Sequence, residues 1–216
     1  GLGLIPTAIE NYVGPNVSIF ADAVTGGNGG RTIFWADRRT EFFGTIRSRG
    51  GRLFGDGGFA EVSGKEELFF SGSVDTTAVN GKSGTLLLDP DTITISGGSG
   101  TASASGATSF TTYEDILESV ASTTNIDMLA TSSITLGNSL NFSQTSGQSV
   151  TFTATNGNIS FSDSSDTIET SGGSIVMSAG GTLSVGAMET NGGDITLTGA
   201  DFTLSGTLNA GAGTLT

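Results

Sequence analysis

The 216-residue chain contains no cysteine and no histidine. Disulfides therefore cannot stabilise it, and the residue that most often serves as general base, metal ligand and pH switch is missing. Proline occurs only three times, which is too few for a proline-rich linker. No apolar run approaches the ~18 residues that a membrane-spanning helix needs. Any chemistry would have to proceed without thiols or imidazoles.

Glycine, in contrast, is abundant. It fills 35 of the 216 positions, whereas its usual share is about 7%. Hydrophobic residues still make up 35% of the chain, and they alternate with serine, threonine and other polar residues. This alternation favours folded structure over a disordered low-complexity tract. All-β architectures often run past ~200 residues undivided, so we expect one elongated domain over residues 1–216.

Charge is unevenly distributed along the chain. The formal net charge is -13, yet all eight basic residues lie within residues 1–82, beside nine acidic residues. Residues 83–216 contain twelve acidic residues and no lysine or arginine. Such an acidic surface repels nucleic acid and anionic membranes. We therefore expect neither nucleic-acid binding nor membrane insertion.

A strand unit that begins with glycine recurs along the chain. Each copy is a glycine turn followed by apolar residues at alternate positions, which is the period of a strand with one buried face. In the last three copies Ile175, Ile195 and Leu215 fall 20 residues apart. The copies are GGRTIFWA (29–36), GGFAEVSG (57–64), GTLLLDP (84–90), GNISFSD (157–163), GGSIVMS (172–178), GGDITLT (192–198) and GTLT (213–216).

A second strand unit follows the first in most copies. We align Phe43 with Phe70 and Leu204 as the apolar residues that precede the recurring glycine, and Gly44 and Gly72 are 28 residues apart. Two strand units that recur together every 20 to 28 residues indicate a solenoid, in which one coil is stacked repeatedly. The copies of this second unit are FFGTI (42–46), FSGSV (70–74), SVGAM (184–188) and LSGTL (204–208).

The predicted fold is an all-β parallel β-helix. A coil of 20 to 28 residues with two or three short strands and no helix fits this fold better than a leucine-rich or helical repeat, and a propeller blade needs ~40 to 50 residues. With strands ~4.8 Å apart, roughly nine coils would form a rod on the order of 40 Å long. We expect less regular, more basic coils over 1–90 and regular acidic coils over about 126–216.

An insertion at about 109–125 departs from the strand pattern. Thr111 and Glu114 have the spacing of a capping box. Together with a run of apolar residues on one face, they predict a short helix over about 112–121. We expect this helix to pack on the side of the rod and to cover apolar surface where the coil cross-section changes. The residues of its apolar face are Ile116, Leu117 and Val120.

Several short motifs occur in a distinctive order within residues 29–95. They are WAD (35–37), FFGTI (42–46), RGG (49–51), GGFAEVSGK (57–65) and GTLLLDPDTI (84–93). In this order they resemble the shaft of filamentous-haemagglutinin-like exoproteins, which Gram-negative bacteria secrete through the two-partner pathway. The segment that follows, DILESVASTTNIDMLATSSITL (115–136), is similar to what comes after LLLDP in that family. Together these segments cover about half of the chain.

The resemblance implies a right-handed parallel β-helix within a long extracellular or cell-surface protein that acts in adhesion, aggregation or biofilm formation. The chain has no Asn-Pro-Asn-Gly signature of the family's N-terminal secretion domain. It also starts at Gly1 without a signal-peptide pattern. We therefore expect a downstream shaft segment, processed or cut from a longer protein at the surface of a Gram-negative bacterium.

Residues 29–51 place five arginines among neighbouring aromatic residues, which taken alone suggests a nucleic-acid-binding surface. The segment is one copy of the repeat, however. Strand alternation directs Ile33 and Trp35 to one side of the strand, and Phe34 and Ala36 to the other. We therefore expect core aromatics and salt bridges between neighbouring coils. Contact with a glycan or a protein through an exposed Phe or Trp is the alternative.

Acidic residues are the remaining candidates for chemistry. Two carboxylates can act as acid and base on a sugar, and the pairs Asp163 with Asp166 and Glu66 with Glu67 have the right composition. They lie in turns or at alternating strand positions, so we expect no enzymatic activity, no catalytic residue and no cofactor. Carboxylates also suit Ca²⁺, although the chain has no EF-hand loop. The weak Ca²⁺ candidates are Asp89, Asp91, Asp163, Asp166, Glu169 and Asp194.

The expected role is therefore structural and non-catalytic, as a shaft or fibre unit of a surface adhesin. The open ends of a β-helix carry unpaired backbone groups, which would pair with neighbouring segments of the same adhesin or with further copies of the chain. The alternative is a carbohydrate- or receptor-binding module that uses one side face of the rod. Exposed aromatic and amide groups that converge on one face would favour this alternative.

Overall fold

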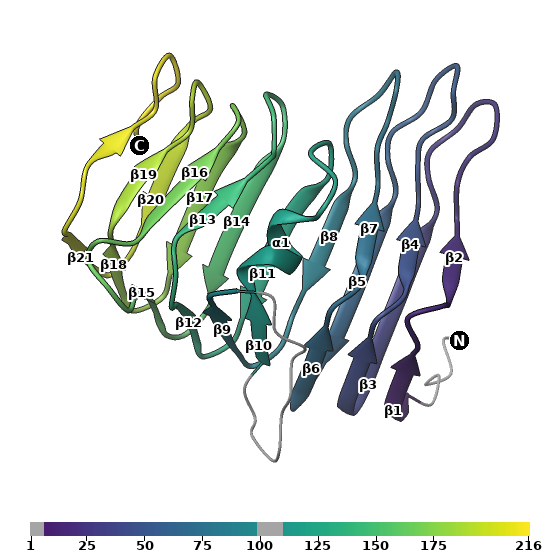
Figure 1. Cartoon of the computed structure of the whole chain (residues 1–216), viewed down its shortest axis with the longest axis horizontal. Helices are drawn as coiled ribbons and strands as arrows, with labels where there is room; N and C mark the ends of the chain where they lie inside the picture. Colours follow the sequence, from purple (N-terminus) through teal and green to yellow (C-terminus); the bar gives the residue numbers. More distant parts are fainter. Residues whose placement is uncertain (1–6, 99–109) are drawn as a thin grey trace, which may run out of the picture.

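The structure is a computed structural model that describes residues 7–98 and 110–216. Position 109, where the predicted insertion begins, lies outside the described residues. The described part is nearly all β, with 22 strands and the short helix α1 (Glu114–Glu118). Every strand pairing in these two ranges is parallel. The coils stack as a parallel β-solenoid (Figure 1).

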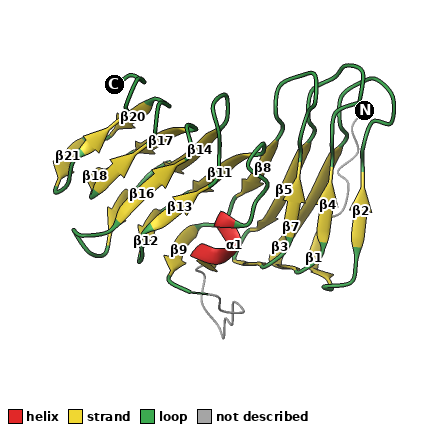
Figure 2. Cartoon of the chain, turned by 45° about the horizontal axis from the view of Figure 1, so that its top comes forward, coloured by secondary structure: helices red, strands yellow, loops and turns green. Residues whose placement is uncertain are grey.

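Strands from successive coils form four sheets that run along the stack (Figure 2). The nine-stranded sheet contains β1 (Ala8–Val13), β3 (Arg31–Phe42), β5 (Phe59–Gly64), β8 (Thr85–Leu88), β11 (Asn125–Ala130), β14 (Ser149–Ala154), β17 (Ser174–Ala179) and β20 (Ile195–Thr198), with β6 (Glu67–Phe70) also paired to β3. The six-stranded sheet contains β10 (Phe110–Tyr113), β9 (Thr92–Ser96), β12 (Ser133–Leu136), β15 (Asn158–Phe161), β18 (Thr182–Val185) and β21 (Asp201–Leu204).

Two smaller sheets complete the coils. The three-stranded sheet belongs to the first coils and contains β2 (Ser18–Phe20), β4 (Thr45–Arg47) and β7 (Ser73–Asp75). The four-stranded sheet belongs to the later coils and contains β13 (Leu140–Phe142), β16 (Thr167–Thr170), β19 (Ala187–Glu189) and β22 (Leu208–Asn209). Helix α1 lies between these two groups of coils (Figure 1).

The register between coils confirms the spacing predicted for the first strand unit. Ile175 pairs with Ile195, and Ile195 pairs with Leu215 through an isolated bridge. Eight strands follow one another along the nine-stranded sheet, and the bridge to Leu215 adds a ninth level. The stack therefore has the roughly nine coils expected from the sequence.

Two of the predicted strand alignments are wrong. The motif GNISFSD forms β15, which pairs with β12 and β18 in the six-stranded sheet and not with the other glycine-led copies. Phe42, rather than Phe43, pairs with Phe70 and is buried. The ring of Phe43 instead lies 6.0 Å from that of Tyr12. An error of one residue moves a side chain to the opposite face of a strand.

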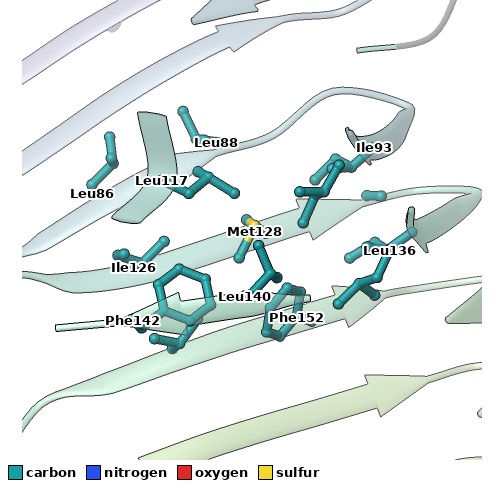
Figure 3. Packing of buried hydrophobic residues seen from close by; sticks show 14 of the residues in the cluster. Leu86, Leu88, Ile93, Leu117, Ile126, Met128, Leu136, Leu140, Phe142 and Phe152 are labelled. Atoms are coloured by element: carbon teal, nitrogen blue, oxygen red, sulfur yellow. The ribbon is translucent and has the colours of Figure 1, made fainter. Parts of the chain in front are cut away.

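The core is a ladder of apolar side chains that stack from coil to coil (Figure 3). These residues are almost completely shielded from water, and each burial of a side chain of this size contributes roughly 1.5–3 kcal/mol. One row comprises Ala60, Leu86, Ile126, Val150, Ile175 and Ile195, and the next comprises Val62, Leu88, Met128, Phe152 and Met177. Because apolar and polar residues alternate within each strand, the apolar residues of successive coils form one continuous interior along the rod.

Helix α1 is shorter than predicted, and the predicted capping box does not form. Thr111 lies in β10, which pairs with β9, because strand pairing continues to Tyr113. Tyr113 occupies the N-cap position with extended backbone and makes no side-chain capping bond. The carboxylate of Glu114 instead accepts a hydrogen bond from the backbone N–H of Gly98 at 2.9 Å. The pairing of β10 with β9 therefore keeps Thr111 in a strand and prevents it from capping the helix.

The apolar face of the helix is nevertheless as predicted. Leu117 is 0% exposed and Val120 is 2% exposed, while Ile116 packs at the edge of the same cluster. The side chain of Leu117 lies among those of the strands (Figure 3). The helix therefore does more than cover the side of the rod, because it contributes a residue to the core itself.

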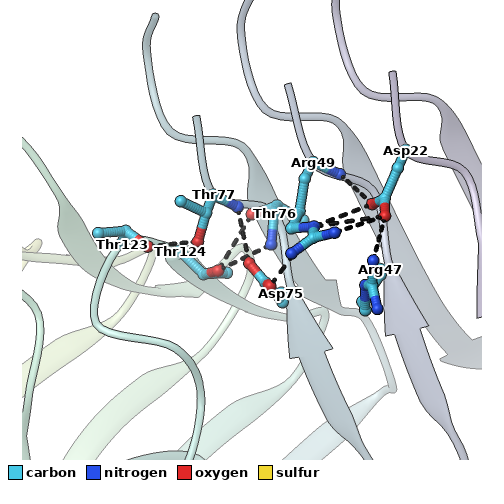
Figure 4. Close-up of polar contacts among 8 residues, drawn as sticks. All are labelled: Asp22, Arg47, Arg49, Asp75, Thr76, Thr77, Thr123 and Thr124. Atoms are coloured by element: carbon cyan, nitrogen blue, oxygen red, sulfur yellow. Dashed lines mark hydrogen bonds and ion pairs between the residues drawn. The ribbon is translucent and has the colours of Figure 1, made fainter. Parts of the chain in front are cut away.

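A column of polar residues is buried at one corner of the coils. Thr76, which precedes β8, donates to Thr124, which precedes β11, through its hydroxyl at 3.2 Å and its backbone N–H at 3.1 Å. The hydroxyls of Thr77 and Thr123 lie 2.6 Å apart (Figure 4). These contacts connect the first coils to the later ones. The members of the column are Ser48, Thr76, Thr124, Gln144, Thr170 and Thr190.

Glycines lie in close contact with the backbone of this polar column. A Cβ atom on Gly57 would lie 1.8 Å from the carbonyl oxygen of Thr76, and one on Gly29 would lie 2.1 Å from the carbonyl oxygen of Ser48. These contacts are with backbone, so a side chain could not move its neighbour aside. The recurring glycines therefore set the thickness of the coil at this corner.

Replacing Gly57 with alanine should lower the free energy of unfolding by about 2–4 kcal/mol, because the new methyl group would meet the backbone of Thr76. Urea denaturation followed by circular dichroism would measure the loss. Gly14→Ala is the matched control, since its Cβ would come no closer than 3.4 Å, to the side chain of Tyr12. Equal effects of the two substitutions would contradict the steric explanation.

Leu117→Ala should destabilise the protein by about 2–5 kcal/mol, because it removes a fully buried side chain from the junction of the two groups of coils. The same substitution at Leu53, whose side chain is 60% exposed, should cost less than about 0.5 kcal/mol. Chemical denaturation of both variants makes the comparison. A Leu117→Ala variant as stable as the wild type would show that the helix is only a surface cover.

Candidate functional site

The arginine-rich first coils form ion pairs from coil to coil. Asp22 accepts hydrogen bonds from the Nη2 atoms of Arg47 at 2.6 Å and Arg49 at 3.0 Å (Figure 4). Arg49 also approaches Asp75 of the next coil at 3.9 Å. These contacts run along one outer face of the three-stranded sheet. They confirm the prediction that salt bridges connect neighbouring coils.

The Asp22 carboxylate is strongly held in its charged form. Burial by itself raises the pKa of this carboxyl group, but hydrogen bonds from the side chain and backbone of Arg49 and from the side chain of Arg47 outweigh burial and bring the pKa down to about 2. The same pairing raises the pKa of Arg49. The cluster is thus a structural brace with its charges mutually satisfied.

The other arginines of this segment combine ion pairs with aromatic contacts. Arg39 lies 3.6 Å from Glu67 and 4.5 Å from the ring centre of Phe69. Arg31 lies 3.9 Å from Glu61 and 4.6 Å from the ring centre of Phe59. Five of the six arginines have a carboxylate partner. Most of the positive charge therefore serves contacts between coils, and the expected absence of a nucleic-acid partner stays a prediction.

The candidate acid pairs do not form matched acid–base sites. Glu67 faces Arg39 on the nine-stranded sheet, whereas its neighbour Glu66 lines a separate groove. Asp163 accepts two hydrogen bonds of 2.8 Å, from the backbone N–H and the hydroxyl of Ser165. These bonds lower the pKa of Asp163, with the backbone bond contributing most. Its partner Asp166 accepts from Ser139 of the neighbouring coil at 3.4 Å, so the two carboxylates have separate hydrogen-bond partners.

The Ca²⁺ candidates are dispersed over the surface. Asp194 accepts a hydrogen bond of 2.8 Å from the backbone N–H of Thr214, and Glu169 lies on β16 between Asn141 and Glu189. Of these candidates, Asp89 and Asp91 line one cavity together. Within residues 7–98 and 110–216, no group of three or more acidic side chains is arranged to hold a metal ion.

A groove of about 480 Å³ crosses the corner where the nine-stranded sheet turns into the six-stranded sheet. We call it the corner groove. Trp35 of β3 forms one wall, and the turns that follow β5, β8 and β11 form the rest. The groove therefore draws on four successive coils. Its lining residues are Trp35, Lys65, Glu66, Asp89, Pro90, Asp91 and Thr131.

Carboxylates dominate the polar lining of the corner groove. Burial and, to a lesser extent, the nearby charge of Glu61 raise the pKa of Asp89. Among the described residues, none donates a hydrogen bond to the Asp89 carboxylate. One oxygen of Asp91 accepts a hydrogen bond of 2.9 Å from the hydroxyl of Ser132, which leaves its other oxygen available. The groove thus presents several carboxylate acceptors, of which Asp89 has no donor among the described residues.

Sequence reasoning identified parts of this groove but not the whole. It named an exposed Trp as the alternative contact with a glycan or a protein, and Asp89 and Asp91 as weak Ca²⁺ ligands, but it missed Lys65 and Thr131. Trp35 lies within β3, but each of the others follows a strand of the nine-stranded sheet at the same corner. The common signal was their position just after the repeated strand, because a solenoid brings equivalent positions of successive coils together.

A scan of protein-family models and a search of curated proteins gave no match to this chain. Within the described part of the chain, no helix has the length and apolar character of a membrane span. Function is therefore inferred from the fold and from the surfaces that it creates.

Asp22→Asn should lower the free energy of unfolding at pH 7 by about 1–2 kcal/mol, because Arg47 and Arg49 lose their shared carboxylate. The native pKa of about 2 lies below the usual value for an unfolded chain. The stabilisation is therefore full above the unfolded pKa and disappears as the pH falls through the native pKa.

Urea denaturation of the wild type and Asp22→Asn at pH 7, 4 and 2.5 would measure this dependence. The difference in stability should shrink steadily towards the lowest pH. The control is Asp201→Asn, which removes an exposed carboxylate and should change stability little at any pH. A difference for Asp22→Asn that stays constant with pH would contradict a role for the charged carboxylate.

Proposed function

We propose that the chain is a structural, non-catalytic shaft or fibre segment of an elongated protein on or outside a Gram-negative bacterial cell. The parallel stack of coils and its continuous apolar ladder support a mechanical role. The ordered motifs that resemble filamentous-haemagglutinin-like exoproteins support the location and a part in adhesion or biofilm formation. The dispersed acidic residues, each with a separate environment, favour a structural role over catalysis.

We further propose that the coils wind as a right-handed β-helix. Successive strands of each sheet are parallel and are joined through connections that leave the sheet and return to it. Such crossovers are right-handed in nearly all proteins, because the twist of the strands favours that direction. The handedness expected from the family resemblance agrees with this rule.

The observation that carries the proposal is the uncovered core at the last coil. In the six-stranded sheet one interior row runs through Ile159, Leu183 and Phe202. The first two side chains are 0% exposed because the next coil covers them, whereas Phe202 is 49% exposed. Leu215 is 52% exposed on the neighbouring sheet. Each earlier interior residue of this row is covered by the next coil. We therefore propose that a further coil covers this end.

The same end has an apolar hollow and unpaired strands. A cavity of about 330 Å³ there is lined almost entirely by aliphatic and aromatic side chains. Strands β21 and β22 are the last members of their sheets, so one edge of each has backbone groups ready to pair. The lining residues are Ile195, Leu197, Phe202, Leu208, Leu215 and Thr216.

A coil added at this end would extend the existing mechanism of stability. It would bury Phe202 and Leu215 as Leu183 and Ile195 are already buried, and it would continue three hydrogen-bonded sheets. The added coil can belong to a neighbouring part of the same protein or to a second copy. In both cases a tensile load along the rod is shared by parallel ladders rather than by one strand.

The proposal is tested by the association of the chain through this end. The wild type should form axial oligomers whose mass rises with concentration in sedimentation velocity, with longer rods in negative-stain electron microscopy. Phe202→Asp should abolish them, since it places a charge in the apolar hollow. Phe54→Asp is the matched control, because Phe54 is 63% exposed on a turn of the first coils.

Circular dichroism would establish that both variants fold. The control variant should associate like the wild type. Association that is equally strong after Phe202→Asp would overturn the proposal that copies join through this end. Chains that remain monomeric at every concentration would exclude a second copy as the occupant and leave a neighbouring part of the same protein.

A further inference from the structure

The corner groove contains a tryptophan that the core does not need. On β3, Phe34 and Ala36 face the interior, and Phe34 packs against the core. Trp35 lies between them in the sequence, so its indole points to the outer side, where it forms a wall of the groove. An aromatic ring has a large flat apolar face, and an exposed one in a concave site is a ready contact surface for a ligand.

The polar end of the same side chain is also unused. Within the described residues, the indole N–H of Trp35 donates no hydrogen bond, whereas the backbone carbonyl of Trp35 accepts one from the Asn11 side chain at 2.8 Å. A tryptophan that serves packing alone usually finds a partner for its N–H or buries its ring. Trp35 does neither completely, because it is only partly buried.

Besides this ring, the groove offers hydrogen-bond acceptors. Asp89 has no donor among the described residues, and Asp91 has a single bond from Ser132. Glu66 adds a third carboxylate, and Lys65 is the only cationic group in the lining. An unpaired carboxylate accepts hydrogen bonds and donates none. The complementary ligand is therefore rich in hydroxyl or amino donors and carries no acidic group.

The dimensions agree with a chain-like ligand. The volume of about 480 Å³ lies within the usual range for ligand sites. The lining comes from four successive coils, which at ~4.8 Å per coil extends about 14 Å along the rod. A ligand would therefore lie along the solenoid axis and contact several coils at once.

We propose that the corner groove binds a short non-acidic saccharide, one ring of which stacks on the indole of Trp35 while its hydroxyl or amino groups donate to Asp89, Asp91 and Glu66. The apolar face of a sugar ring matches the aromatic face. The net negative lining excludes sugar acids and sulfated glycans by repulsion. This site is independent of the role proposed for the end of the rod, because none of its residues lies at the last coil.

Trp35 is the only tryptophan in the chain, so its fluorescence reports on the groove directly. The full chain would be titrated to ~10 mM, a range that detects weak binding, with three probes: a neutral β-linked glucose hexamer, a glucosamine hexamer and a galacturonate hexamer. A saturable change of emission is expected with the neutral hexamer, the glucosamine hexamer or both, and none with the galacturonate hexamer.

Variants assign the binding to named residues, with affinity measured by calorimetry so that loss of the fluorophore does not matter. Trp35→Ala should weaken binding about tenfold or more, and Asp89→Asn about threefold to tenfold. The matched controls are Tyr12→Ala, an aromatic that is 68% exposed outside the groove, and Asp163→Asn in a distant turn. Both should bind like the wild type, and circular dichroism would establish that all four variants fold.

Several results would overturn the proposal. The first is the lack of a saturable response to either non-acidic hexamer. The second is equal binding of the galacturonate hexamer, and the third is an unchanged affinity after Trp35→Ala. A titration with Ca²⁺ alone that shifts the Trp35 emission and blocks the sugar would replace the saccharide site with a cation site. The state of the rod end, tested by Phe202→Asp, would not affect any of these outcomes.

Discussion

The stacking of one coil on the next in fixed register is the constraint on which the rest of this structure depends. Each interior residue, such as Ile175, is covered by an equivalent residue of the adjacent coil, here Ile195. The backbone ladder and the apolar ladder therefore require the same register. A slip of one residue would break the hydrogen bonds and also turn the whole interior row outwards. This double requirement lets short strands, many of only three or four residues, define a stable body.

Register is hardest to keep where the coil changes size, and the structure has specific contacts there. Helix α1 lies between Thr76 and Thr124 in the sequence, yet the two hydroxyls meet at 3.2 Å. Leu117 fills the interior beside this junction. Polar contacts at the corner and an apolar plug in the core thus act together. Neither alone would align both the hydrogen-bond ladders and the side-chain rows of the two groups of coils.

Much of the fold could be predicted from the sequence because period-two alternation after glycine repeats from coil to coil. The assignment of β15 to a sheet could not, since strands of both large sheets follow glycine and alternate in the same way. The predicted helix was too long because Thr111 also suits a strand. The pairing of β10 with β9 places Thr111 in a strand instead. The corner groove was only partly foreseen, because its residues are scattered between Trp35 and Thr131 and meet only through the coil register.

The separation of charge along the chain has a consequence for how the rod lies in its surroundings. The basic residues brace the first coils, as Arg47 and Arg49 do around Asp22, while residues 83–216 carry acidic groups alone. Because sequence order becomes position along the axis, the molecule has an electric dipole parallel to its length. Within a Debye length of an anionic surface, this dipole turns the first coils towards that surface and the acidic coils away from it. The rod thereby acquires a preferred direction before any specific contact forms.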